Sequence, residues 1–241
     1  MLLEKHLPKP LGDVLGLCAL YGTKSEANQQ LVYRTIQQHA DQLVAMAQMA
    51  DSDINLLASV QALILLQIIR LLDGDIRQRA NAENLQPFLV SSVGRLEQRM
   101  QGADDPAQST AALLKTHKSD AWETWILAES IRRTVIMGHS LHGLYFFLKN
   151  GWDDSHHEFE RLSFFGQGTL WCAQSRFEWE SAVVKHHPSP IRFATLDSDM
   201  ATIQPEEIEE LGVIMMAMTK GVDEVCHWIG HQLLDKYGLK T

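Results

Sequence analysis

Residues 54–72 read INLLASVQALILLQIIRLL and form the most apolar stretch of the 241-residue chain. Five polar residues interrupt it, namely Asn55, Ser59, Gln61, Gln67 and Arg70. These interruptions argue against a membrane span, which requires about 20 mainly apolar residues. Apolar residues still cover most of the helical circumference, which is typical of a helix enclosed by other helices. The stretch therefore predicts a central buried helix, and we expect no membrane partner.

The segments on either side repeat the helical spacing of apolar residues. They predict helices over 25–49, 76–100, 120–150 and 177–184, with a last helix running toward Leu234. Ser25 is expected to cap the first of these helices, and Pro87 to kink or divide the second. The helix over 120–150 is expected to turn a stripe reaching Leu144 and Leu148 toward the core. Pro205, with four glutamates in residues 206–210, predicts a further helix N-terminus.

Helical periodicity fades between residues 152 and 199, where aromatic residues mix with paired histidines, glycines and prolines. The sequence contains no internal repeat, sustained heptad pattern or strand hairpin signal. It therefore predicts an all-α fold, a single helical array of about seven or eight helices with an irregular aromatic-rich segment at 152–199. We expect one domain over residues 1–241, with a mobile loop at about 102–118 that begins GADDPAQS.

The composition restricts the classes of function. Thirty acidic and twenty-one basic residues give a formal charge of -9, which repels polyanions and disfavours autonomous binding of DNA or RNA. The three cysteines, Cys18, Cys172 and Cys226, are far apart and odd in number, which fits neither a disulfide framework nor a clustered zinc site. The N-terminus has no uninterrupted apolar run typical of a secretory signal. An intracellular location is therefore expected.

Three further stretches resemble a known family. They are WETWILAESIRRTVIMGHSLHGLYFFLKNGW at 122–152, TLWCAQSRFEWESA at 169–182 and IQPEEIEELGVIMMAMTKGVDEVCHW at 203–228. The first contains the element W-x-x-W-I-x-A-E-S-x-R-R-T, and the second contains L-W-x-A-x-S-x-x-x-W. In this order they resemble the fungal-specific transcription factor domain, the helical regulatory region that follows a binuclear zinc cluster in many fungal regulators.

This resemblance implies a regulatory domain that binds a small-molecule effector or a protein partner. Members of the family contact DNA through a six-cysteine, lysine-rich zinc cluster, and three scattered cysteines cannot build one. We therefore expect no direct contact between this chain and nucleic acid, whether it is part of a longer regulator or a stand-alone relative. The nucleus is the location that the resemblance implies, and a homodimer is among the expected assemblies.

One helical face carries a candidate site for an acidic ligand. Glu129 lies three and four residues before Arg132 and Arg133, so the carboxylate can pair with either guanidinium. An ion pair that orders helix packing is the main interpretation. The alternative is that Arg132 or Arg133 binds an acidic effector through the two parallel hydrogen bonds that a guanidinium offers a carboxylate.

Two histidine pairs have spacings that place both rings on one side of a helix. They are His139 with His142 and His227 with His231. Such pairs can hold a metal ion or supply an acid and a base. The second pair lacks the glutamate that makes the zinc-protease helix motif specific. Surface or hydrogen-bonded core histidines are therefore the main interpretation, and we expect no metal and no cofactor.

Aromatic residues gather around the irregular segment, among them Phe146, Trp152, Trp171 and Trp179. They predict either an ordinary core or the wall of an apolar pocket for a small molecule. The pocket favours a second hypothesis, a cytoplasmic, cofactor-independent cyclase, isomerase or lyase of fungal secondary metabolism. Its acid or base would be His139, His142 or His227. The sequence contains no nucleophile elbow, phosphate loop or dinucleotide fingerprint, which makes an enzyme the less favoured hypothesis.

Overall fold

The computed structural model describes residues 7–100, 110, 120–152, 156–186 and 188–239. The described chain is mostly helical, which confirms the predicted fold class, and eight of its helices have eight or more residues. It divides into two compact units, Met1–Gly102 with Ser130–Phe159, and Ala103–Glu129 with Glu160–Thr241. The predicted single domain stays a prediction. Apart from Thr110, the expected loop at 102–118 lies outside the described residues.

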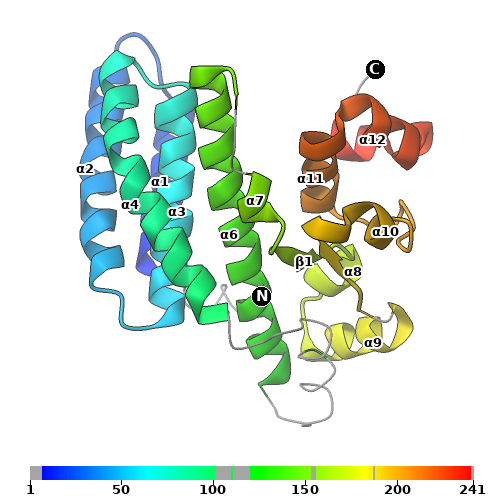
Figure 1. Cartoon of the computed structure of the whole chain (residues 1–241). Helices are drawn as coiled ribbons and strands as arrows, with labels where there is room; N and C mark the ends of the chain where they lie inside the picture. The colour runs from blue at the N-terminus through cyan, green and yellow to red at the C-terminus, as the bar shows by residue number, and fades with distance from the viewer. Residues whose placement is uncertain (1–6, 101–109, 111–119, 153–155, 187, 240–241) are drawn as a thin grey trace. The chain divides into compact units, whose positions relative to one another are not determined.

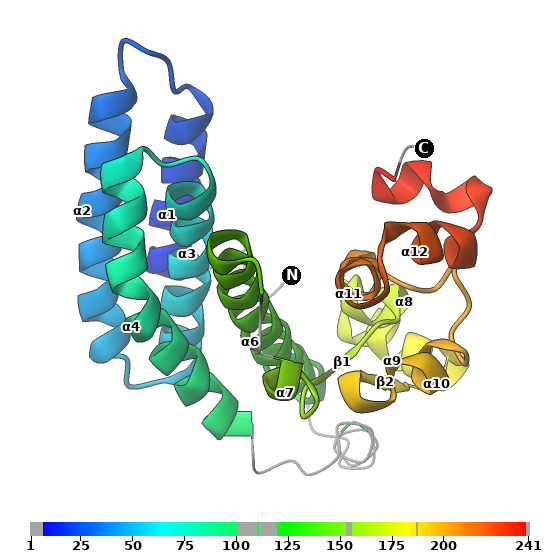
Figure 2. The same ribbon diagram turned by 45° about the horizontal axis from the view of Figure 1, so that its top comes forward.

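The first unit is a bundle of long helices (Figures 1 and 2). It comprises α1 (Lys9–Gly22), α2 (Gln29–Gln48), α3 (Asp53–Leu72), α4 (Ile76–Met100), the part of α6 (Ala121–Asn150) after Glu129, and the short α7 (His156–Phe159). Helix α3 packs against α1, α2 and α4. The predicted order of long helices is thus confirmed, with α1 as an addition.

Helix α3 is the core helix of this bundle. It begins after Ser52, whose hydroxyl oxygen accepts a hydrogen bond from the Asn55 amide at 3.3 Å. Its length and hydropathy alone are sufficient for a membrane span, but 72% of its most apolar window is buried inside the structure. The central buried helix predicted from residues 54–72 is therefore confirmed.

Two predicted details of the bundle are wrong. Helix α2 begins at Gln29, because the Asn28 amide group bonds the backbone of Thr23 and Ser25 and holds those residues in a turn. Leu144 and Leu148 in the last turns of α6 are exposed rather than inward. Helix α4 is not divided at Pro87, although proline removes one backbone hydrogen bond, and the alternative of a kink there stays a prediction.

The second unit combines short helices with a two-stranded sheet (Figure 1). Strand β1 (Ser163–Phe165) pairs antiparallel with β2 (Pro190–Arg192), with Phe164 opposite Ile191. The helices are α8 (Gly168–Trp171), α9 (Arg176–His186), α10 (Leu196–Met200), α11 (Glu210–Lys220) and α12 (Val222–Ile229). The sheet lies inside the segment predicted to be irregular, where strands of three residues are too short to give a periodic signal.

Two predicted helix ends in the second unit are also wrong. Pro205 does not open a helix, because residues 205–207 form a turn and Ile208 makes a β-bridge to Gln167. Helix α11 starts later, at Glu210. The last helix stops at Ile229, since Gly230 adopts a positive φ of 78° that ends regular helix. Short 3-10 turns then lead past Leu234.

An aromatic cluster forms the core of the second unit. The Trp125 ring centroid lies 5.7 Å from those of both Phe165 and Trp179. The fully buried Glu129 carboxylate accepts a hydrogen bond from the backbone N–H of Phe165 at 3.0 Å, which joins the start of α6 to β1. Residues 121–129 of α6 thus belong to this core, while later residues of the same helix belong to the bundle.

Candidate functional site

His139 is a buried histidine held by carboxylates of its own unit. Its Nδ1 lies 2.7 Å from Oε2 of Glu158, and its Nε2 lies 3.7 Å from Oε2 of Glu97. The ring of Phe159 packs edge-on against the imidazole with centroids 6.2 Å apart. Only 4% of His139 is exposed. This geometry is that of a hydrogen-bonded core histidine, which was the main interpretation of the sequence.

The other candidate histidines have different surroundings. His142 is half-buried beside the ring of Phe146, with centroids 6.4 Å apart. His227 and His231 are exposed and belong to the second unit. Over the described residues, no group of three or more histidine, cysteine or acidic side chains is placed to hold a metal ion.

Glu129, Arg132 and Arg133 are all buried. Glu129 is completely buried, and each arginine is 8% exposed. The Glu129 carboxylate accepts a hydrogen bond from the backbone N–H of Phe165 and does not face solvent. Pairing of Glu129 with Arg132 or Arg133 stays a prediction, as does effector binding by either arginine.

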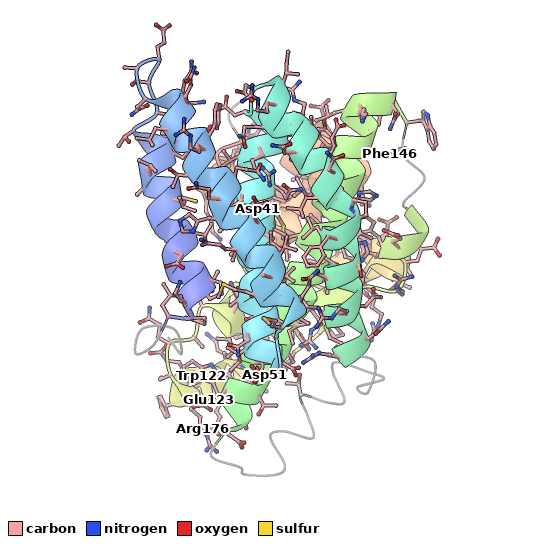
Figure 3. All side chains as sticks on the ribbon, turned by 90° about the vertical axis from the view of Figure 1, so that its left-hand side faces the viewer. Asp41, Asp51, Trp122, Glu123, Phe146 and Arg176 are labelled. Carbon is pink, nitrogen blue, oxygen red and sulfur yellow. The ribbon has the colours of Figure 1, made fainter. Side chains whose placement is uncertain are left out.

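The four candidate aromatic residues fall into two pairs, one in each unit. Phe146 contacts Trp152 edge to face, with centroids 5.1 Å apart, and 56% of Trp152 is exposed. Trp179 is completely buried in the aromatic core, and Trp171 is half-buried. Figure 3 places Phe146 at the far end of α6 from Trp122. Trp179 therefore has the role of an ordinary core residue.

The bundle has a hollow of about 980 Å³ between α2 and α4. None of the candidate residues discussed above lines it. Its lining comprises Gln30, Tyr33, Arg34, Gln37 and Gln38 from α2, and Asp75, Ile76, Arg77, Gln78, Ala80 and Asn81 from α4 and the residue before it. The volume falls within the range of about 300–1,000 Å³ that is usual for ligand pockets. This hollow is therefore the candidate functional site.

The residues that α2 contributes to the hollow are spaced to lie on one side of the helix. Its five residues lie at positions i, i+3, i+4, i+7 and i+8, which share one face of a helix. Figure 3 views the chain from the side of α2 and labels Asp41 farther along this helix. The helical spacing of these polar residues is visible in the sequence, but a search for periodic apolar residues does not find it.

A buried cation lies next to this face of α2. Arg70 of α3 is completely buried, and its Nη2 donates to Gln37 Oε1 at 2.8 Å, while its Nη1 donates to Gln67 Oε1 at 3.2 Å. Its Nε has no hydrogen-bond partner. Burial lowers the pKa of Arg70, and the negative charge of Asp41 opposes that shift. The guanidinium is thus held by neutral amides.

The same amides continue into the hollow. Gln37 Oε1 also accepts a hydrogen bond from Asn81 Nδ2 at 3.1 Å, and its Nε2 donates to Asp41 Oδ1 at 2.9 Å. Gln67 Nε2 donates to the backbone carbonyl of Ala82 at 2.9 Å. These bonds tie α2, α3 and α4 together around Arg70. They also fix two of the amide groups that line the hollow, those of Gln37 and Asn81, because both are hydrogen-bonded.

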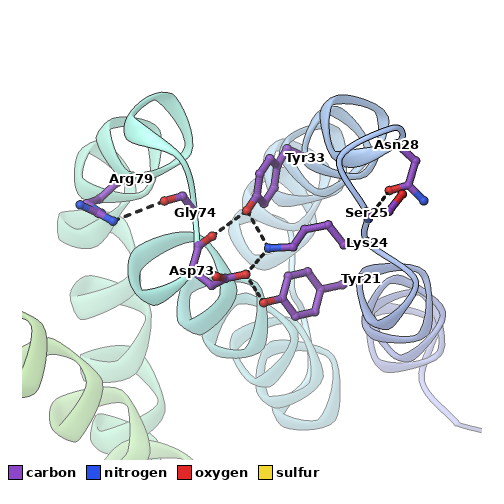
Figure 4. Close-up of polar contacts among 8 residues, drawn as sticks. All are labelled: Tyr21, Lys24, Ser25, Asn28, Tyr33, Asp73, Gly74 and Arg79. Carbon is purple, nitrogen blue, oxygen red and sulfur yellow. Dashed lines mark hydrogen bonds and ion pairs between the residues drawn. The ribbon is translucent and has the colours of Figure 1, made fainter.

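A polar clasp of Tyr21, Lys24, Tyr33 and Asp73 joins α1, α2 and α3 near the hollow (Figure 4). The Asp73 carboxylate accepts hydrogen bonds from the Lys24 ammonium and the Tyr21 hydroxyl. Tyr33, which also lines the hollow, donates to the backbone carbonyl of Asp73 at 2.6 Å. The clasp thereby fixes the Tyr33 ring at the hollow.

The clasp shifts the titration of its members. The Lys24 ammonium, and then the Tyr21 hydroxyl, hold the pKa of Asp73 below its ordinary value. The same carboxylate raises the pKa of Lys24. A carboxyl group whose pKa is lower in the folded state stabilises the fold above its unfolded pKa, and this contribution is lost as pH falls through the folded pKa.

We expect Asp73→Asn to lower the melting temperature at pH 7 and to reduce the acid sensitivity of the fold. The difference from wild type should shrink as pH falls below about 4, because protonation removes the same charge from Asp73. Thermal unfolding between neutral pH and about pH 2 measures this difference. Asp13→Asn, which removes a carboxylate from an exposed pair with Lys9, is the control. A wild-type advantage that stays constant over this range would contradict the assigned role of Asp73.

Comparison with known proteins identifies one relative. The chain is 37% identical over 241 residues to transcription factor gsfR2 of Penicillium aethiopicum. The aligned region covers 99% of this chain and 58% of that relative, so the chain spans little more than half of the relative's length. No family model matches, and no solved structure matches. The chain is therefore homologous to a fungal transcription factor over nearly its whole length.

Proposed function

We propose that this chain is a regulatory region of the fungal-specific transcription factor domain type, which acts in the nucleus by binding an effector or partner and does not itself contact DNA. The observation that carries this proposal is the identity to a fungal transcription factor along 99% of the chain. The three motif stretches quoted above all fall within this alignment.

Charge supports the second part of the proposal. DNA affinity comes mainly from lysine and arginine at phosphates, and this chain has a formal charge of -9. Several of its basic side chains are engaged with carboxylates, including Lys24 with Asp73, Arg99 with Asp53 and Lys220 with Asp197. Cys18, Cys172 and Cys226 are free thiols rather than members of a cluster.

The enzyme hypothesis requires a histidine acid or base in an aromatic pocket. His139 instead lies between carboxylates, His142 lies beside the ring of Phe146, and His227 is exposed. The hollow between α2 and α4 is lined by none of them. These observations support the regulatory proposal over the enzyme.

We expect the purified chain to show no measurable affinity for duplex DNA at about 150 mM salt, because neither net charge nor a zinc cluster supplies phosphate contacts. Fluorescence anisotropy with labelled random-sequence and promoter duplexes measures this. The same chain fused to a heterologous DNA-binding module, titrated with that module's own site, is the positive control. Tight, sequence-selective binding by the unfused chain would contradict the proposal.

A further inference from the structure

We propose that the hollow between α2 and α4 binds a small amphipathic organic anion, a carboxylate with an apolar body. The assignment of this molecule as the effector rests on the proposed function. The binding site itself rests on the charges and the apolar surface of the hollow.

The charges of the hollow favour an anion. Arg34 and Arg77 line it, and both are exposed. Among the described residues, no carboxylate oxygen lies within 4 Å of either guanidinium group. The acidic lining residue, Asp75, already accepts a hydrogen bond from the backbone N–H of Gln78 at 2.8 Å and so caps α4. Guanidinium groups bind carboxylates through two parallel hydrogen bonds.

The buried Arg70 adds to this local field. Its guanidinium bonds only the amide oxygens of Gln37 and Gln67 among the described residues. Gln37 separates it from the hollow and lines the hollow itself. Electrostatic interactions are stronger in a low-dielectric interior than in water, so this neighbouring cation favours an anion in the hollow. The guanidinium groups of Arg34, Arg70 and Arg77, set against the carboxylates of Asp41 and Asp75, leave one positive charge in excess around the hollow.

Apolar surface in the hollow calls for an apolar ligand body. The Tyr33 ring, held by its hydroxyl in the clasp, lies on one side, and Ile76 and Ala80 lie on the other. Ile76 is 87% exposed, so a ligand that covers it gains hydrophobic free energy. An inorganic ion cannot use this surface. The charges and the apolar surface together define an organic carboxylate.

The test uses benzoate as the probe, since it carries a carboxylate and an apolar ring. Benzyl alcohol lacks the charge, and inorganic phosphate lacks the apolar body. Isothermal titration calorimetry on the full chain measures each affinity. The variant is Arg34→Gln with Arg77→Gln. The control, Arg176→Gln with Arg192→Gln, removes two charges from the second unit.

We expect wild type and the control variant to bind benzoate with the same affinity. The Arg34→Gln, Arg77→Gln variant should bind about tenfold more weakly, because two charge-assisted contacts are lost. Circular dichroism and melting temperature verify that each variant is folded.

Three results would overturn the proposal. They are no binding of benzoate by wild type up to about 10 mM, unchanged affinity in the double arginine variant, and phosphate or benzyl alcohol binding as well as benzoate. The double arginine variant alters exposed side chains, so it is expected to fold. Because calorimetry involves neither DNA nor transcription, failure of this site is distinguishable from failure of the regulatory function.

Discussion

Trp179→Ala is expected to lower the free energy of unfolding by about 3–5 kcal/mol, the usual cost of truncating a large buried aromatic residue. Trp179 is completely buried, and its ring packs against Trp125 in the core of the second unit. Truncation leaves a cavity among side chains that belong to three segments of the chain. Urea unfolding followed by circular dichroism measures the loss.

A matched control lies two residues earlier on the same helix. Phe177 is 77% exposed, so Phe177→Ala should change the free energy of unfolding by no more than about 0.5 kcal/mol. Similar losses for the two variants would contradict the placement of Trp179 in the core. Because the indole N–H of Trp179 has no hydrogen-bond partner, Trp179→Phe should cost less than Trp179→Ala.

Gly138→Ala is expected to destabilise the bundle by about 1–3 kcal/mol, the usual cost of overpacking a core. A Cβ atom at Gly138 of α6 would lie 2.5 Å from Cγ2 and 3.3 Å from Cγ1 of Val93 on α4. Val93 is buried, and its branched side chain has little freedom to rotate away. Glycine at this position therefore lets the two helices approach closely.

A substitution at Gly94, which lies on α4 itself, is expected to have the opposite effect on stability. A Cβ atom there meets nothing within 4 Å, so Gly94→Ala should stabilise the chain by up to about 1 kcal/mol through helix propensity. Chemical denaturation of both variants under identical conditions gives the comparison. Stabilisation by Gly138→Ala equal to that by Gly94→Ala would show that α4 and α6 do not pack as closely as described.

Helices with strong apolar periodicity were predictable from the sequence. Residues 54–72 and 120–150 gave α3 and α6 with ends within one residue of those observed. Sequence signals for a helix start were wrong where the backbone pairs with a distant part of the chain. Pro205 and its glutamates resemble a helix start, yet Ile208 pairs with Gln167, which lies about 40 residues earlier in the chain and outside any sequence window. The apolar spacing does not predict α1, although Pro10 in its first turn is a start signal.

The candidate site was less predictable than the fold. The face of α2 from Gln30 to Gln38 is visible as a polar helical period, but only tertiary packing shows that α4 lies opposite and that Arg70 is buried beside Gln37. The surroundings of His139 were also not predictable from its spacing. Its spacing from His142 suggested a shared site, whereas its contacts are Glu158 from α7 and Glu97 from α4. Spacing along one helix does not reveal what neighbouring helices contribute.

The central claim is that this chain regulates transcription without contacting DNA itself. The most direct measurement fuses the chain to a heterologous DNA-binding module and records transcription of a reporter carrying that module's site in a fungal host. We predict that the fusion changes reporter output several-fold relative to the module alone, and that the same fusion with Trp179→Ala, at matched protein level, returns it toward the module-alone value. Reporter output equal to that of the module alone for the folded wild-type fusion would contradict the claim.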